Sequence, residues 1–392
     1  MGTFLKSFLI AILLFLFLGA VFFAGYAFHA SLQPEDNFTI LDQAYQILKD
    51  NGLKEIPPDP KMEYGMIKGM LQTYDDAYTI FLEPVQHELQ TDSLQGRFGG
   101  IGARIEKADN GNWLLFPLPG GPAERANIQE GDILQSVDKL QVTDQTSQDT
   151  ILAALRGPVG SPVTLTILRK RDQQPVELTL KREEIELPSV TWNLIPDQPN
   201  IGIMHVNLIA DSTGQEIQEA VLDLKQKGAT HFMLDLRDNP GGLLTAGVDV
   251  ARLFLQEGVV LEQQYRGKDK QVFYVDKPGD LVNLPLVILI NQNSASAAEI
   301  IAGALKAQNR AKLVGTNTFG KDSIQVVFNL HDQSSLHVTA AKWWIPGINT
   351  PIGNGGIQPD LFIDPTNDPN APDPIILAAT QILLTPEKSD NP

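Results

Sequence analysis

The second half of the chain repeats one pattern, in which a short apolar run precedes a polar turn and a helical stripe. The apolar runs are rich in β-branched residues and are typical of buried strands. They lie at 201–206, 231–236 and 286–290. The helical stripes lie at 213–227, at 243–255 and from Ala297 onward. Successive strand–turn–helix units predict an α/β core over 190–365 with a mainly parallel sheet.

The first half follows different patterns. Residues 31–92 look helical throughout, with Gly52 placed to end a first helix and a second helix predicted at 62–73. Residues 95–182 combine a glycine-rich loop, strands and one short apolar helical stripe, and we expect a separate domain there. The tail, 366–392, is rich in proline and aspartate and carries one predicted helix at 374–384.

The N-terminus carries an apolar run without charge, from Phe8 to Phe28, preceded by Lys6. This run is long enough to span a bilayer, and the lysine favours an N-terminus inside the cytoplasm. We therefore expect residues 1–30 to be a membrane anchor, with the rest of the chain outside the cytoplasm. A cleaved signal peptide is the alternative, because residues 25–27 resemble a cleavage site.

Composition excludes several classes of function. The net charge is -17 and the isoelectric point is near 4.7, which argues against nucleic acid as a partner. The chain has no cysteine, so disulfides and thiolate chemistry are excluded. The six histidines show no metal-ligand spacing, and we expect neither a metal nor another cofactor.

The stretch 285–307 carries the first candidate for chemistry. A strand leads through a polar turn into a helix whose N-terminus presents unpaired N–H groups and the positive end of a dipole. Ser296 lies at that point, where a developing oxyanion would be stabilised. The alternative is that Ser294 and Ser296 only cap the helix, with Glu299 completing a capping box.

The second candidate lies at 313–330. Alternate positions in this stretch are apolar, which predicts a strand with one buried face. They are Ile324, Val326, Phe328 and Leu330. Lys321 and Gln325 then share the opposite face, about 13 Å apart if extended, and a bend at 320–323 would bring them closer. The alternative is a solvated lysine on an exposed face.

Residues 95–182 resemble a PDZ domain. In that family a loop such as Gly100-Ile101-Gly102 captures a C-terminal carboxylate, and the peptide adds as a strand beside it. The resemblance implies that Ile151, Leu152 and Leu155 line the pocket for the peptide side chain. The alternative is a glycine loop shaped only for packing.

The chain from about 35 to 365 resembles the C-terminal processing peptidases, also called tail-specific proteases. Five segments in order carry this resemblance. They are Gly99 to Gly102, Asp235 to Gly242, Ser294 to Ile300, Gly315 to Gln325 and Gly355 to Asp360. The implied fold is an α/β (α+β multidomain) chain with a crotonase/ClpP-like serine protease core, an inserted PDZ domain and an N-terminal helical region.

The resemblance also implies roles for individual residues. Ser296 would be the nucleophile, Lys321 the general base and Gln325 the residue that orients the lysine. The oxyanion hole would use an amide at Gly241, with Gly242 as the other candidate, together with the amide of Ala297. The physics agrees, because a lysine base must be neutral, and a glutamine can hold the amine without adding negative charge.

The resemblance implies an exported serine endopeptidase that recognises and cleaves proteins near their C-terminal tails, with the PDZ domain binding or gating the substrate. A homodimer through the N- and C-terminal regions is also implied. Two departures from the family pattern, Ala298 and Ala77 within 75–79, are expected to leave the dyad untouched. The alternative function is a non-catalytic tether that gathers protein tails at the membrane.

Overall fold

The structure is a computed structural model that describes residues 19, 21, 38–57, 60–171, 174–348, 350–366, 368 and 371–385. The chain divides into two units, 1–67 and 68–392, each described by itself. The predicted membrane segment, Phe8 to Phe28, lies outside the described residues except for Gly19 and Val21. No helix in the described part of the chain combines the length and apolar character that a bilayer span requires.

Two helices follow the start of the described chain, as the apolar spacing predicted. Helix α2 (Thr39–Asn51) ends at Gly52, whose N–H donates to the carbonyl of Leu48 at 2.8 Å. Helix α2 buries none of its residues, although its stripe of apolar side chains is well defined. Helix α3 (Lys61–Tyr74) follows and runs across the division between the two units.

A mainly parallel sheet forms the centre of the second unit, as predicted. In the described part of the chain its strand order is β10-β11-β12-β15-β16-β19, and every pair after β10–β11 is parallel. The strands are β10 (Val190–Ile195), β11 (Gln198–Val206), β12 (His231–Asp235), β15 (Leu286–Ile290), β16 (Lys312–Gly315) and β19 (Leu361–Phe362).

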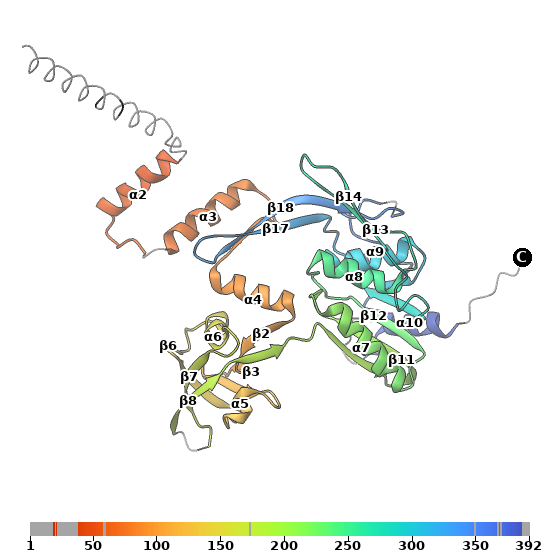
Figure 1. Cartoon of the computed structure of the whole chain (residues 1–392), viewed down its shortest axis with the longest axis horizontal. Coiled ribbons are helices and arrows are strands. Elements are labelled where there is room, and N and C mark those ends of the chain that lie inside the picture. Colours follow the sequence, from red (N-terminus) through yellow and green to blue (C-terminus); the bar gives the residue numbers. More distant parts are fainter. Residues whose placement is uncertain are drawn as a thin grey trace, which may run out of the picture. The chain divides into compact units, whose positions relative to one another are not determined.

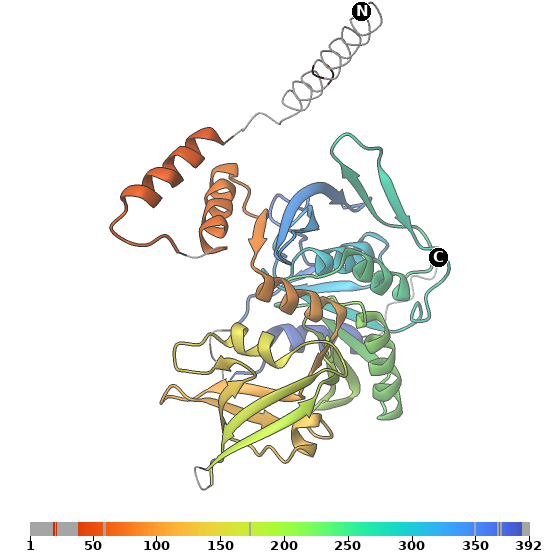
Figure 2. The ribbon, with the colours of Figure 1, turned by 60° about the vertical axis from the view of Figure 1, so that its left-hand side comes forward.

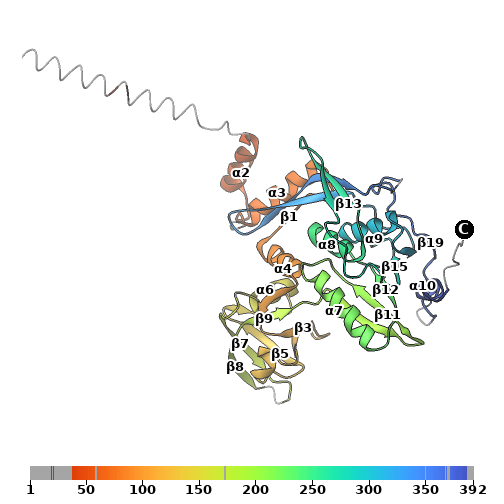
Figure 3. The ribbon, with the colours of Figure 1, turned by 45° about the vertical axis from the view of Figure 1, so that its right-hand side comes forward.

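Helices cover both faces of this sheet (Figures 1 and 3). One face carries α7 (Thr213–Gln226), α8 (Leu244–Phe254) and α9 (Ala297–Ala307), and the other carries α10 (Pro374–Leu384). In β15, Ile288 and Ile290 join the core beneath α7–α9, whereas Val287 and Leu289 join the core beneath α10. Because side chains alternate along a strand, burial on both faces requires a continuous apolar run.

A second sheet holds the segment predicted to be a strand near 324–330. Its strands are β1 (Ile80–Leu82), β13 (Val259–Tyr265), β14 (Gln271–Tyr274), β17 (Ser323–Asn329) and β18 (Ser335–Trp344). The prediction of helix throughout 31–92 was wrong at β1, which pairs antiparallel with the distant β18. Helix α4 (Pro84–Gln95) follows β1.

The prediction of one buried face for β17 was also wrong. Phe328 is 51% exposed, and Ile324 and Val326 are only partly buried. Strand β17 pairs with β18 alone among the described strands, and its register shifts between Ile324 and Gln325. The extra residue at the register shift is Ala340 of β18, and β17 has a neighbouring strand on one side only, with its end from Val327 to Asn329 exposed.

A third sheet forms a domain with a core of its own (Figure 2). Its strands are β3 (Ala103–Lys107), β4 (Trp113–Pro117), β5 (Asp132–Val137), β6 (Leu140–Gln141), β7 (Pro162–Leu168) and β8 (Pro175–Lys181). Two helices accompany it, α5 (Pro122–Arg125) and α6 (Gln148–Leu155). The strands β2 (Arg97–Gly100) and β9 (Glu183–Glu186) pair with each other where the chain enters and leaves this domain.

Candidate active site

Ser296 stands where β15 turns into α9, in a strained backbone conformation with φ 55° and ψ -117°. Its N–H donates to the Glu299 carboxylate at 2.8 Å. Ser294 is different, because it is fully buried and its hydroxyl donates to the carbonyl of Leu236 at 2.8 Å. The polar turn therefore contains one structural serine and one serine that reaches a cavity.

Ser296 shares this cavity with Lys321 and Gln325. The cavity has a volume of about 510 Å³, and Gly241 and Gly242 also line it. Much of its wall is apolar. The apolar residues are Leu89, Leu94, Leu208, Leu243, Leu244, Ile300, Ile324, Val327 and Trp343. The structure thus brings the three residues predicted to form the dyad and its support into one partly apolar site.

Lys321 lies just before β17, within the bend predicted at 320–323. Its Nζ donates to Gln325 Oε1 at 2.9 Å and lies 4.9 Å from the centroid of the Tyr78 ring. Burial lowers the pKa of the Lys321 amine, although the charges of Glu299 and Asp76 act in the opposite direction. Among the described residues no carboxylate forms an ion pair with Lys321, and no hydrogen bond joins its amine to Ser296.

The turn after β12 approaches Ser296 closely. A Cβ added to Gly241, which has φ +99°, would lie 2.8 Å from Ser296 Cβ. The Gly241 N–H donates to Asn239 Oδ1 at 2.8 Å and is therefore already engaged. The amides of Gly242 and Ala297 donate to no other described residue. Of the two glycines considered for the oxyanion hole, the geometry favours Gly242.

Glu299 connects the two halves of the site, a link that sequence reasoning missed. One carboxylate oxygen accepts from Thr318 Oγ1 at 2.6 Å and from the Gly320 N–H at 2.7 Å. The other accepts from the Ser296 N–H at 2.8 Å and from the Lys321 N–H at 2.9 Å. Burial raises the pKa of this carboxyl, and the four hydrogen bonds oppose that effect. The capping-box spacing indicated only the bond to Ser296.

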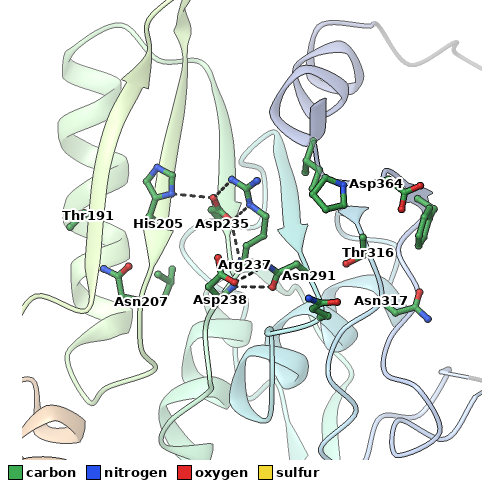
Figure 4. A pocket seen from close by; sticks show the side chains of 15 residues that line it. Thr191, His205, Asn207, Asp235, Arg237, Asp238, Asn291, Thr316, Asn317 and Asp364 are labelled. Carbon is green, nitrogen blue, oxygen red and sulfur yellow. Dashed lines mark hydrogen bonds and ion pairs between the residues drawn. The ribbon is translucent and has the colours of Figure 1, made fainter. Parts of the chain in front are cut away.

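A larger cavity lies at the carboxyl ends of the parallel strands and is shown in Figure 4. Residues that line it hold together the turn after β12 and the segment before Ser296. There Asp238 Oδ1 accepts from Asn291 Nδ2 at 2.9 Å and Asn293 Nδ2 at 2.8 Å, which ties the glycine turn to the segment before Ser296. Burial raises the pKa of Asp235, but hydrogen bonds from Arg237 and His205 bring it below its usual value.

The predicted peptide-binding residues of the third domain lie in two different places, a loop before β3 and helix α6. Gly100, Ile101 and Gly102 form the loop that leads into β3, and Gly102 has φ +65°. Strand β3 is an edge strand of its sheet, as addition of a peptide strand requires. Ile151 and Leu155 pack into the core at 0% and 3% exposure, and the expectation that they line the pocket for the peptide side chain stays a prediction. Leu152 is partly exposed.

Comparison with known proteins matches the domain with the third sheet and the part with the central parallel sheet to two different families. A model of peptidase family S41 matches residues 200–363, and a PDZ domain model matches residues 117–169. A carboxyl-terminal-processing protease of Synechocystis sp. is 35% identical over 330 residues, which cover 83% of this chain and 77% of that protein. This chain belongs to peptidase family S41. It is a serine-type peptidase of mixed α/β fold with a PDZ domain.

Further proteins similar to this chain show comparable coverage. A carboxy-terminal-processing protease of Bartonella bacilliformis is 33% identical over 314 residues, covering 79% of this chain and 71% of that protein. Among solved structures, a photosystem II D1 C-terminal processing protease is 30% identical, with a TM-score of 0.46. That similarity covers 82% of this chain and 87% of the other.

The described part of the S41 peptidase shows no cluster of side chains of the kind that binds a metal ion. No group of three or more His, Cys, Asp or Glu side chains gathers there in a way that could hold an ion.

Proposed function

We propose that this S41 peptidase is a C-terminal processing endopeptidase with a Ser296–Lys321 dyad. Neutral Lys321 takes the hydroxyl proton as Ser296 Oγ attacks the scissile carbonyl carbon. When the tetrahedral intermediate collapses, the lysine returns the proton to the leaving amine, and an acyl-enzyme remains. Water then attacks the ester with Lys321 again as base, which releases the acid product and restores the serine.

The observation that carries this proposal is the environment of the Lys321 amine. It lies in the same cavity as Ser296, and its partner, Gln325 Oε1 at 2.9 Å, is uncharged. A carboxylate at that place would hold the proton on the amine and disable the base. No hydrogen bond joins the Lys321 amine to Ser296 among the described residues, so the proposal requires that one forms when substrate binds.

Two backbone amides are available for the oxyanion. The N–H groups of Gly242 and Ala297 are free within the described residues and belong to the two segments that meet at Ser296. Each donor aimed at the developing charge contributes about 3 kcal/mol to the transition state. The Gly241 amide stays with Asn239 and supports the turn instead.

The substrate is a protein with an exposed, apolar C-terminal tail. The apolar wall of the catalytic cavity supports an apolar side chain beside the scissile bond. The relatives named as carboxyl-terminal-processing proteases support cleavage near the tail. The PDZ domain binds the tail beside β3 or gates access to the dyad, with Gly100 to Gly102 receiving the terminal carboxylate.

The test is cleavage of a model protein that ends in apolar residues, with the products identified by mass spectrometry. Ser296→Ala and Lys321→Ala should each abolish the new termini while leaving the melting temperature within about 2 °C of the parent, because neither change removes core packing. Cleavage by either variant at the parent rate would refute the dyad. Tail binding by the unmodified protein without any new terminus would instead favour the non-catalytic tether.

Location is a separate part of the proposal. Phe8 to Phe28 would anchor the chain, and the peptidase body would lie outside the cytoplasm. The charge-free run and the preceding Lys6 support this placement. Protease added outside intact cells should digest the peptidase body. A body protected until the membrane is opened would overturn the placement, and a soluble form shortened near residue 27 would indicate a cleaved signal peptide.

Assembly is proposed as a homodimer through the terminal regions. Helix α2 supports this, because Ile40 is 81% exposed and Leu48 is 56% exposed on the same apolar stripe. An exposed stripe of this kind is stabilised when it meets another apolar face. Sedimentation of the chain without residues 1–30 should give a dimer, and a monomer at about 10 μM would contradict it.

A further inference from the structure

The segment Asp76–Thr79 contacts the proposed base and its supporting glutamine through one residue, Tyr78. The carbonyl of Tyr78 accepts a hydrogen bond from Gln325 Nε2. The ring of the same residue faces the Lys321 amine, with 4.9 Å between Nζ and the ring centroid. One residue therefore contacts both the proposed base and the residue that orients it.

The segment holds Tyr78 in this place through its own hydrogen bonds. Asp76 accepts from the Tyr78 N–H at 3.1 Å and from Thr79 Oγ1 at 2.7 Å. Thr79 Oγ1 in turn accepts from the Thr339 N–H of β18 at 3.1 Å, and Thr79 is only 6% exposed. Because β18 also pairs with β17, which carries Gln325, the two contacting residues are fixed to the same sheet.

The contact with the Tyr78 carbonyl determines which end of the Gln325 amide faces the lysine. A carbonyl oxygen accepts only from the NH2 end of the glutamine, so Oε1 is left to meet the Lys321 amine. With the amide reversed, the Gln325 NH2 group would face the donors of the protonated Lys321 amine, and Oε1 would face the Tyr78 carbonyl oxygen, which is also an acceptor. The carbonyl therefore selects the orientation that can hold a lysine.

The contact with the ring acts on the charge of the lysine. The face of an aromatic ring attracts a cation, which stabilises the protonated amine. Burial acts in the opposite direction and lowers the pKa of the amine, while Asp76 and Glu299 act with the ring and raise it. An apolar side chain of similar size would keep the burial and remove the attraction.

We propose that Tyr78 is a positioning residue of the peptidase, which orients Gln325 through its carbonyl and holds the Lys321 amine against its ring between turnovers. This rests on the proposed role of Lys321 as the base. Substitution of the Tyr78 side chain removes the ring and leaves the backbone carbonyl on Gln325 in place. It therefore acts through Lys321 and not on the substrate, and it changes the turnover number and its pH dependence more than the Michaelis constant.

The experiment compares Tyr78→Leu with Tyr78→Phe and with Tyr74→Leu, a control at a 63% exposed tyrosine four residues upstream. The full chain is used, with the apolar-tailed model protein as substrate and kcat and KM measured across pH. Tyr78→Leu should move the rising limb of the pH profile down by about 0.5 pH unit. It should lower kcat by about tenfold and change KM by less than about twofold.

Tyr78→Phe keeps the ring and should return the limb to the position of the parent, and Tyr74→Leu should match the parent. The proposal is overturned if the profile of Tyr78→Leu coincides with that of Tyr74→Leu, or if Tyr78→Phe shifts as far as Tyr78→Leu. Tyr78→Met replaces the leucine variant if the latter melts early. Activity retained by Lys321→Ala would overturn the base itself, whereas an inactive Lys321→Ala with an unshifted Tyr78→Leu would overturn only the role of Tyr78.

Discussion

The amine of the partly buried Lys321 has an uncharged hydrogen-bond partner and an aromatic ring beside it. Burial is the largest influence, and it lowers the pKa of the amine, whereas Glu299 and Asp76 raise it. Neither carboxylate forms an ion pair with the lysine among the described residues. At the scale of single residues, the site therefore makes the neutral form that a general base needs easier to reach than it is for a lysine in water.

This balance predicts the pH dependence of the reaction. A base works when it has lost its proton, so kcat/KM should rise with pH through a pKa below the usual 10.5 of lysine. Gln325→Glu places a negative charge beside the Lys321 amine, which stabilises the protonated amine and should move the rising limb to higher pH. The measurement is kcat/KM for the model substrate from about pH 6 to 10, where a flat profile would contradict a lysine base.

At the scale of elements, one carboxylate connects a helix to a loop that follows it in the chain. Glu299 lies in the first turn of α9, and it accepts from N–H groups of Gly320 and Lys321 in the loop before β17. The same side chain accepts from the Ser296 N–H. The spacing between the nucleophile and the base is therefore set by hydrogen bonds to a single buried group.

Glu299→Gln tests this link. The amide brings an NH2 group to a place where two donors already point, so one pair of donors loses its acceptor and faces a repulsive contact. We expect kcat/KM to fall by about 100-fold and the free energy of unfolding to fall by about 2 kcal/mol. Glu257→Gln, at an exposed glutamate, is the control and should change neither. Unchanged activity in Glu299→Gln would show that the spacing is set elsewhere.

The strand and helix on either side of Ser296 could be predicted from sequence because their signals are local. The run Leu286 to Ile290 is buried at every position, and α9 begins at Ala297 as predicted. Strand β1 was missed because a strand of three residues is too short to show an alternation of apolar and polar positions. Its partner, β18, also follows only about 250 residues later. The same distance along the chain concealed the contact between Tyr78 and Gln325.

At the scale of the whole molecule, separate cores support the PDZ domain and the peptidase part of the chain. Leu115 is fully buried in the cluster of the PDZ domain. Ile375 of α10 is 3% exposed and packs on the central sheet with Val287 and Leu289. Because the apolar clusters share no residue, each can lose packing without the other.

Calorimetry of two matched variants checks this independence. Ile375→Ala and Leu115→Ala each remove a buried aliphatic side chain and should each cost about 2–5 kcal/mol. Ile375→Ala should lower the melting temperature of the transition in which the peptidase part unfolds and activity is lost. Leu115→Ala should lower the melting temperature of a different transition, in which the PDZ domain unfolds. A single transition that both variants lower equally would show that the two cores unfold together.

The sequence by itself determined the parallel sheet, the helices on it, and the residue types at Ser296, Lys321 and Gln325, because strand and helix periods and a strand–turn–helix junction are properties of neighbouring residues. Tertiary structure alone decided that Glu299 joins nucleophile and base, that Gly241 donates to Asn239, and that Tyr78 meets Gln325. These contacts join segments whose separation along the chain leaves no periodic signal. Their geometry follows from how sheets and helices pack, and only the folded chain specifies it.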